Sequence, residues 1–324
     1  MLSSSSKFLA VAIALVVAFE YSNATTMDGL SIFDGSNLEA KIEAMNAGVH
    51  NPFREFNELV NLIFFQYLGL SSVETYVNTN LGSDYGYYFL CYLRDLVAGT
   101  AVYWITASLW HLTIYNIMGD KLFVKKGRPF PSFETISDQM ALAQASIFVY
   151  AGLPILSEIL IENKLTRCFF YLGEVGLVPS LVYFLIYIVL VEIGIYWMHR
   201  TLHTNKFLYK YIHALHHKYN KSLTLTPWAS IAFNPIDGLL QASPYVIFLF
   251  FVPVNYFVHV FLLFFSGVWA TNIHDAVWGD SEPIMGAKYH TVHHTHYHYN
   301  FGQFFIFCDY FFGTLKVPEK SKFD

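Results

Sequence analysis

Three short histidine clusters have the residue type and spacing of metal-binding motifs. They read HRTLH over residues 199–203, HALHH over 213–217 and HTVHH over 290–294. Within each cluster the histidines stand three or four residues apart, so on a helix their imidazoles share one face and converge on one point. Neutral imidazole is a suitable ligand for first-row transition metals such as iron and zinc. Eight histidines exceed what one ion needs, so the sequence predicts two metal ions. The eight are His199, His203, His213, His216, His217, His290, His293 and His294.

A local excess of histidine is the alternative interpretation, since histidine-rich tracts also trap metals. Such tracts keep no helical period and have no preferred place relative to apolar segments. Here the first two clusters follow a long apolar run that ends at Met198, and the third follows another apolar region. This placement favours a metal site at the ends of membrane helices.

The composition is that of an integral membrane protein. Of 324 residues, 55% are apolar and only 13% are charged, about half the charged fraction of soluble domains. A net charge of −5 gives no sign of nucleic-acid binding. The three cysteines are far apart in the sequence and form no disulfide or metal motif.

Four apolar stretches can build the membrane part of an all-α protein. The first three can each span once, whereas the fourth is broken by Pro244 and Pro253 and predicts a helical hairpin. The stretches are 96–118, 139–160, 175–198 and 236–273. If the hairpin returns to its starting side, all three clusters lie on one face of the membrane, in a helical cap that holds the metals. A single span there would put them on opposite faces and exclude the site.

Positive charge indicates which face this is. Lysine and arginine are frequent in the loops over 121–128 and 200–221, which two spans separate and which therefore share a side. Such an excess marks the cytosol. Lys320 and Lys322 in the tail 319–324 form a KxKxx-like pattern, which resembles the retrieval signal of endoplasmic reticulum proteins. We therefore expect a multi-pass protein of that membrane, with the histidine clusters and the C-terminus in the cytosol.

The N-terminal part carries less information. Residues 1–25 contain an apolar run after Lys7 and then small polar residues, which fits either a cleaved signal peptide or an uncleaved signal anchor. Residues 26–90 form a poorly defined N-terminal region without strong periodicity.

Further motifs accompany the clusters, and together they resemble a known family. They are TP at 226–227, FNPIDGLLQ at 233–241, NIHD at 272–275, YHTVHH at 289–294, NFGQ at 300–303 and FGT at 312–314. The whole set is similar to the fatty acid hydroxylase/sterol desaturase superfamily, and most of all to plant-type sterol C-5 desaturases, also called lathosterol oxidases. The resemblance indicates a membrane-embedded sterol desaturase domain over 91–318.

The resemblance implies an O2-dependent oxidoreductase of sterol biosynthesis that introduces the C5–C6 double bond into Δ7-sterols. Its cofactors would be two iron ions. The electrons would come from NAD(P)H through cytochrome b5 and its reductase, since this chain has no dinucleotide, haem or flavin motif of its own. The eight clustered histidines and His274 would be the metal ligands.

Six further residues are candidates for supporting the ligands. Asp275 could orient its neighbour His274. Glu192 precedes His199 by seven residues within a span, where it could bond an imidazole or pair with another helix. Asn234 stands where the family usually has histidine. The remaining candidates are His296 and His298, which could equally be surface residues, and Gln303, which could shape the turn after the last cluster.

Two other functions remain open. Sister enzymes of the superfamily oxidise sterol C-4 methyl groups or hydroxylate sterols and fatty acyl chains, and histidine spacing does not separate these reactions from desaturation. A membrane metal-binding or transport protein is the alternative from another class. It would favour ligands deep within the spans and a polar path across them, whereas these clusters stand at span ends.

Overall fold

The computed structural model describes residues 51–220, 224–275 and 282–318. Its contacts divide the chain into two units, Met1–Glu55 and Phe56–Asp324, and the second contains all the predicted site residues. In the described residues the regular structure is helical, with two isolated β-bridges and no strand. The predicted leader over 1–25 and the tail over 319–324 lie outside the described residues, and the domain boundaries remain predictions.

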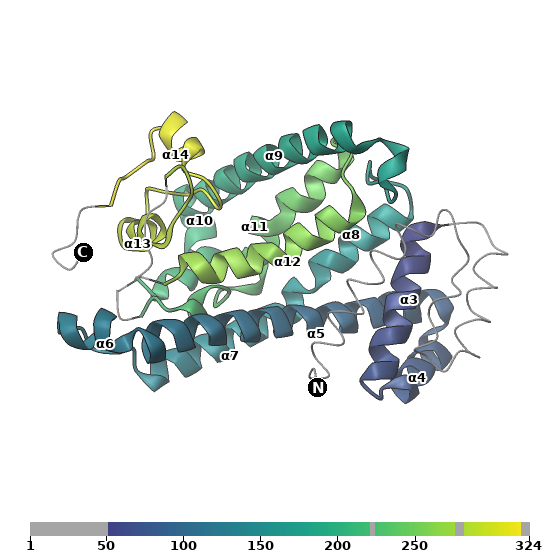
Figure 1. Ribbon diagram of the computed structural model, residues 1–324, viewed down its shortest axis with the longest axis horizontal. Coiled ribbons are helices and arrows are strands. Elements are labelled where there is room, and N and C mark those ends of the chain that lie inside the picture. The colour runs from purple at the N-terminus through teal and green to yellow at the C-terminus, as the bar shows by residue number, and fades with distance from the viewer. Residues whose placement is uncertain (1–50, 221–223, 276–281, 319–324) are drawn as a thin grey trace. The chain divides into compact units, whose positions relative to one another are not determined.

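The helices vary widely in length (Figure 1). The α-helices are α3 (Pro52–Tyr67), α4 (Ser71–Leu81), α5 (Ser83–His111), α6 (Gly119–Leu122), α7 (Phe133–Tyr150), α8 (Gly152–Glu162), α9 (Leu177–Thr204), α10 (Lys206–Leu208), α11 (Pro235–Ile247), α12 (Tyr256–Ile273), α13 (Ala287–His296) and α14 (Phe307–Phe311). Two π-helical segments cover Leu112–Ile117 and Tyr209–His213. Short 3₁₀ segments cover Val124–Lys126, Leu172–Glu174, His216–Lys218, Pro227–Ala229 and Phe248–Phe250.

Three helical segments are long and apolar enough to cross a membrane: Phe133–Glu162, Leu177–Thr204 and Tyr256–Ile273. Their outward faces are apolar, as in α9, where Leu181 is 55% and Leu185 60% exposed. A face of this kind is costly in water and suits lipid. The prediction of an all-helical membrane protein is confirmed. The predicted span 96–118 falls largely in α5, which is not among the three, so the number of spans remains a prediction.

The predicted hairpin over 236–273 is present as α11 and α12. Helix α11 packs against both α12 and α9 (Figure 1). Asn255 caps α12 after the turn, because its side chain accepts a hydrogen bond from the Phe257 amide. Asp237 at the start of α11 contacts His213, and His274 at the end of α12 contacts His216. Both open ends of the hairpin therefore meet the histidine clusters, as the site requires.

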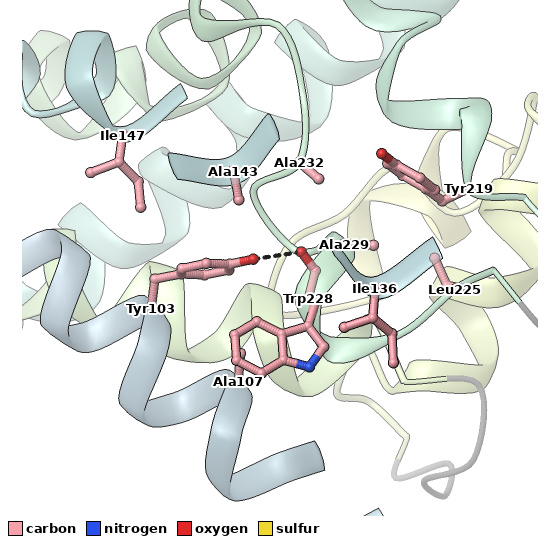
Figure 2. Packing of buried hydrophobic residues seen from close by; sticks show 10 residues of the cluster. All are labelled: Tyr103, Ala107, Ile136, Ala143, Ile147, Tyr219, Leu225, Trp228, Ala229 and Ala232. Carbon is pink, nitrogen blue, oxygen red and sulfur yellow. Dashed lines mark hydrogen bonds between the residues drawn. The ribbon is translucent and has the colours of Figure 1, made fainter. Parts of the chain in front are cut away.

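A buried cluster fixes the segment between the second histidine cluster and α11 (Figure 2). The Tyr103 hydroxyl of α5 donates to the Trp228 carbonyl at 2.8 Å. Gln139 of α7 donates to the Thr224 carbonyl at 2.6 Å and accepts from the Thr226 hydroxyl at 2.5 Å. These bonds satisfy polar groups that burial would otherwise leave unpaired. They tie the segment to α5 and α7, and so set the position at which α11 begins.

Candidate metal centre

The histidines of the three clusters and His274 gather in two buried groups. The first group has five members and the second has four, and within each the possible ligand atoms all lie within 4.8 Å of one another. The first contains His199, His203, His213, His217 and His293, and the second contains His216, His274, His290 and His294. All nine predicted ligands are thus brought together, although their binding of metal remains a prediction. The grouped histidines could hold metal.

Each HxxHH cluster contributes to both groups rather than to one point as the spacing suggested. His213 and His217, four residues apart, join the first group, while His216 joins the second. The last cluster does the reverse, since the pair His290 and His294 joins the second group and His293 the first. In α13 the physical reason is angular: at 100° per residue, positions i+3 and i+4 lie on opposite sides of position i. Adjacent histidines can therefore face different ions.

Five elements carry these side chains. His199 and His203 occupy the last two turns of α9, and His274 follows the end of α12. His213 ends a π-helical segment, and His216 and His217 belong to a 3₁₀ turn. The last cluster lies on α13. Such irregular turns are common at functional sites because they change the direction in which side chains project.

Backbone carbonyls fix the protonation of three imidazoles. A carbonyl oxygen only accepts, so the contacting Nδ1 must carry the proton, and in a neutral imidazole Nε2 is left with a bare lone pair. The Nδ1-to-carbonyl distances are 3.0 Å from His199 to Phe301, 2.8 Å from His293 to Tyr299 and 2.6 Å from His274 to Ala270. Among the described residues, Nε2 of His199 and of His293 has no hydrogen-bond partner. Two buried lone pairs without a donor fit a metal ligand set.

Close nitrogen pairs give the same indication. Nε2 of His213 is 2.9 Å from Nε2 of His203 and 3.0 Å from that of His217. In the second group Nε2 of His274 is 3.2 Å from that of His216 and 3.1 Å from that of His290. Lone pairs at this distance repel unless a proton or a cation lies between them. Several nitrogens directed at one another are what a metal ion would organise.

Burial keeps the imidazoles neutral. It lowers the pKa of His274 to about 4, and a hydrogen bond to the Ala270 carbonyl opposes part of that shift. Burial, with repulsion from neighbouring imidazoles, also holds the pKa values of six others well below the usual 6.5: His213, His216, His217, His290, His293 and His294. Metals bind the neutral ring, so these histidines are in the binding form at neutral pH.

Asp237 is a site residue that the sequence reasoning did not single out. It is fully buried, and its Oδ2 accepts from Nδ1 of His213 at 2.7 Å. Its Oδ1 accepts from Nε2 of Gln241, one turn along α11, at 2.8 Å. A carboxylate behind a ligand imidazole fixes the ring orientation and strengthens the ligand. The sequence feature that could have indicated this role was an aspartate in the first turn of an otherwise apolar hairpin.

Glu192 supports the chain that follows the last cluster, and not an imidazole. Its Oε1 accepts from the backbone amides of Gln303 at 2.9 Å and Phe305 at 3.1 Å, and its Oε2 from that of Phe304 at 2.9 Å. The sequence left an imidazole or another helix open as its partner, and the carboxylate instead bonds a loop backbone. Gly302 is required beside it, since a Cβ there would collide with the Phe305 carbonyl and approach the Glu192 carboxylate.

The other predicted supporting residues have smaller or different roles. Asn234 caps α11, accepting from the Ile236 amide at 3.0 Å. His296 and His298 are exposed, in agreement with their alternative interpretation as surface residues. Asp275 is fully buried, but Nδ1 of His274 bonds the Ala270 carbonyl. Gln303 joins the turn by its backbone, accepting from the Trp269 indole at 2.7 Å.

Comparison with known proteins identifies the family. A family model for fatty acid hydroxylases matches residues 184–314, which include every grouped histidine. The chain is 44% identical over 230 residues to a Delta(7)-sterol-C5(6)-desaturase of Nicotiana tabacum, covering 71% of this chain and 84% of the relative. An Arabidopsis thaliana protein with the designation "Putative Delta(7)-sterol-C5(6)-desaturase 2" is 42% identical over 246 residues, covering 75% of this chain and 88% of the relative. The chain belongs to the fatty acid hydroxylase/sterol desaturase superfamily.

The superfamily predicted from the motifs is therefore confirmed, as is the similarity to plant sterol C-5 desaturases. A fungal relative, a Delta(7)-sterol 5(6)-desaturase of Gibberella zeae, is 32% identical over 72% of this chain and 64% of its own length. No solved structure matches the chain. Within the superfamily, the two histidine groups of this member lie at the end of its membrane helices, beside a cavity that reaches between α9, α11 and α12.

Proposed function

We propose that this protein is a di-iron membrane desaturase that uses O2 to introduce the C5–C6 double bond into Δ7-sterols. The observation that carries the proposal is the pair of buried, neutral imidazole groups in a chain that is 44% identical to a Delta(7)-sterol-C5(6)-desaturase. The two groups would each hold one iron through the nine histidines. Imidazole sites also accept zinc, so the metal content must be measured.

The reaction explains why such a centre is needed. A sterol C–H bond is not acidic, so a general base alone cannot remove its hydrogen. Bound iron would activate O2 as the oxidant. The reaction would also consume two electrons. We infer that these electrons come from NAD(P)H through cytochrome b5 and its reductase, because the sequence has no motif for a cofactor that could collect them.

The residues of this chain would hold and orient the centre. Asp237 and the backbone carbonyls set the imidazole orientations, and burial keeps the rings unprotonated. The cavity beside the second group, which His216, His274 and His290 help to line, would admit the substrate. A sterol would enter from the bilayer. We further propose the endoplasmic reticulum as location, with the histidines on the cytosolic face.

Complementation of a yeast strain that lacks its own sterol C-5 desaturase tests the function. The sterols would be analysed by ultraviolet absorption and mass spectrometry, and we expect the conjugated Δ5,7-diene to return. His293→Ala and His216→Ala, one from each group, should abolish it. His296→Ala is the matched control, because this exposed histidine lies on the same helix as His293 and should leave the diene unchanged.

Other products would point to the alternatives. A hydroxylated sterol or acyl chain, or loss of a C-4 methyl group, would indicate a sister reaction of the superfamily. Metal accumulation without any oxidised lipid would favour a metal-binding or transport protein. Well-expressed protein that gives no diene in a strain that supplies Δ7-sterol would contradict the proposal.

A further inference from the structure

The cavity beside the second histidine group contains a buried tyrosine hydroxyl whose role the metal centre does not explain. Its walls come from α9, α11, α12 and the segment before α11, and they include His216, His274 and His290. Tyr245 of α11 lines the same cavity and is only 1% exposed. Its hydroxyl has no hydrogen-bond partner of ordinary length and angle in the described part of the chain. An unpaired buried hydroxyl costs roughly 1–3 kcal/mol, so its retention calls for a function.

Three other polar side chains of the cavity already have partners. Gln241 donates to Asp237 at 2.8 Å, and Ser230 accepts from the Thr271 hydroxyl at 3.2 Å. Ser266 lies beside Tyr245 but makes no hydrogen bond of ordinary length and angle with it; its hydroxyl donates to the Leu263 carbonyl at 2.6 Å and can only accept from the tyrosine. The Tyr245 hydroxyl is thus available to a ligand, and the neighbouring polar groups have less capacity left for one.

We propose that Tyr245 binds the C-3 hydroxyl of the sterol and so positions C-5 and C-6 at the metal centre. This inference rests on the proposed desaturase function. A phenol can donate one hydrogen bond and accept another, which matches an alcohol. In a sterol C-3 is two carbon–carbon bonds from C-5. A group that holds the hydroxyl must therefore line the same cavity as the imidazoles, and Tyr245 does.

The direction of the side chain supports this placement. Tyr245 follows Asp237 by eight residues, which is about 12 Å along a helix. Helical side chains lean toward the N-terminus of their helix, and the N-terminal end of α11 is the end that contacts the imidazoles. We therefore infer that the hydroxyl of Tyr245 lies nearer to the metal centre than its backbone does.

A second cavity provides room for the sterol hydrocarbon. It also contains another side chain that could bind the C-3 hydroxyl. It shares Tyr150, Ile231 and Gly267 with the first cavity, and its other walls are almost entirely apolar. Asp95 lines it, and its Oδ2 has no partner in the described residues, whereas its Oδ1 accepts from Arg94 at 2.9 Å. No imidazole lines this second cavity, so a sterol hydroxyl held at Asp95 would leave C-5 away from the histidines.

Kinetics with two substrates test the proposal. Membranes that contain the full chain, cytochrome b5 and its reductase would be supplied with NADH and either a Δ7-sterol or its 3-deoxy counterpart. For Tyr245→Phe we expect kcat/KM for the hydroxylated sterol to fall by about three- to tenfold, the effect of one neutral hydrogen bond. The value for the 3-deoxy sterol should not change. Thermal stability should be equal or higher, because the variant removes an unpaired polar group.

Tyr196→Phe is the matched control, because this buried hydroxyl is bonded to Thr314 at 2.9 Å and lines neither cavity. Any effect of this variant should be the same for both sterols. Equal effects of Tyr245→Phe on the two sterols, or none, would overturn the anchor while leaving the desaturase function intact. A selective loss in Asp95→Asn instead would assign the hydroxyl to the second cavity. Absence of diene from the unmodified chain with both sterols would overturn the proposed function, and the anchor with it.

Discussion

Replacing Asp237 tests how much its hydrogen bond to the predicted ligand His213 contributes to metal affinity. The fully buried carboxylate accepts from His213 at 2.7 Å and from Gln241 at 2.8 Å. It therefore fixes the proton of His213 on Nδ1 and directs the Nε2 lone pair toward His203 and His217. Asp237→Asn keeps the shape and an acceptor oxygen but removes the charge. Asp237→Ala removes the bond and leaves the His213 N–H without its partner.

The expected loss of metal affinity can be estimated for each of these two substitutions. Loss of a partner behind a metal-bound histidine typically lowers metal affinity by about 10- to 100-fold. We expect Asp237→Asn near the lower end, because the asparagine oxygen can still accept from His213 while the Gln241 amide turns to match. We expect Asp237→Ala near the upper end. The free-energy losses are about 1.4 and about 2.8 kcal/mol, at 1.4 kcal/mol for each tenfold change.

The assay is metal retention in purified detergent-solubilised protein. Samples loaded with iron would be dialysed against a graded chelator, and the bound iron measured by mass spectrometry. The control is Asp120→Asn, which also removes a carboxylate but from an exposed pair with Lys125. Equal iron retention in Asp237→Ala and the unmodified protein, at every chelator concentration, would refute the reasoning. So would an equal loss in the Asp120 control.

Three further outcomes are expected. Glu192→Gln should lower the free energy of unfolding by about 2–4 kcal/mol, because its amide group would face a backbone N–H donor; thermal melting would measure this, and a shift no larger than that of exposed Glu134→Gln would contradict it. Gly302→Ala should abolish diene formation by displacing the loop after the last cluster, whereas Gly152→Ala, with open space around it, should not; full activity of the Gly302 variant would argue against the tight turn. Metal retention should be lost on acidification. Burial depresses the imidazole pKa values, so the neutral rings that bind metal are fully present above the unfolded pKa of about 6.5. They are protonated, and release the metal, as the pH falls toward about 4, the pKa of His274. Metal release already complete at a pH of about 6.5 would conflict with these shifts.

The sequence by itself determined the kind of site and the class of protein. Residue type and spacing were sufficient because imidazole chemistry is local, and because a helix brings residues i and i+4 to the same face. Apolar length likewise predicted the membrane helices, since lipid requires every buried backbone group to be paired within its own segment. The hairpin could be predicted from Pro244 and Pro253, which interrupt a stretch too long for one span.

Only the tertiary structure decided how the histidines divide between the two groups and which carboxylates support the site. His216 and His217 are adjacent in sequence, but they join different groups: His216 lies against His274 at the end of α12, and His217 lies against His293 of α13. Asp237 could not be distinguished from an ordinary first-turn aspartate until its contact with His213 was known. Glu192 binds a loop more than one hundred residues away. Sequence periodicity describes one segment at a time, whereas these contacts depend on how separate segments pack.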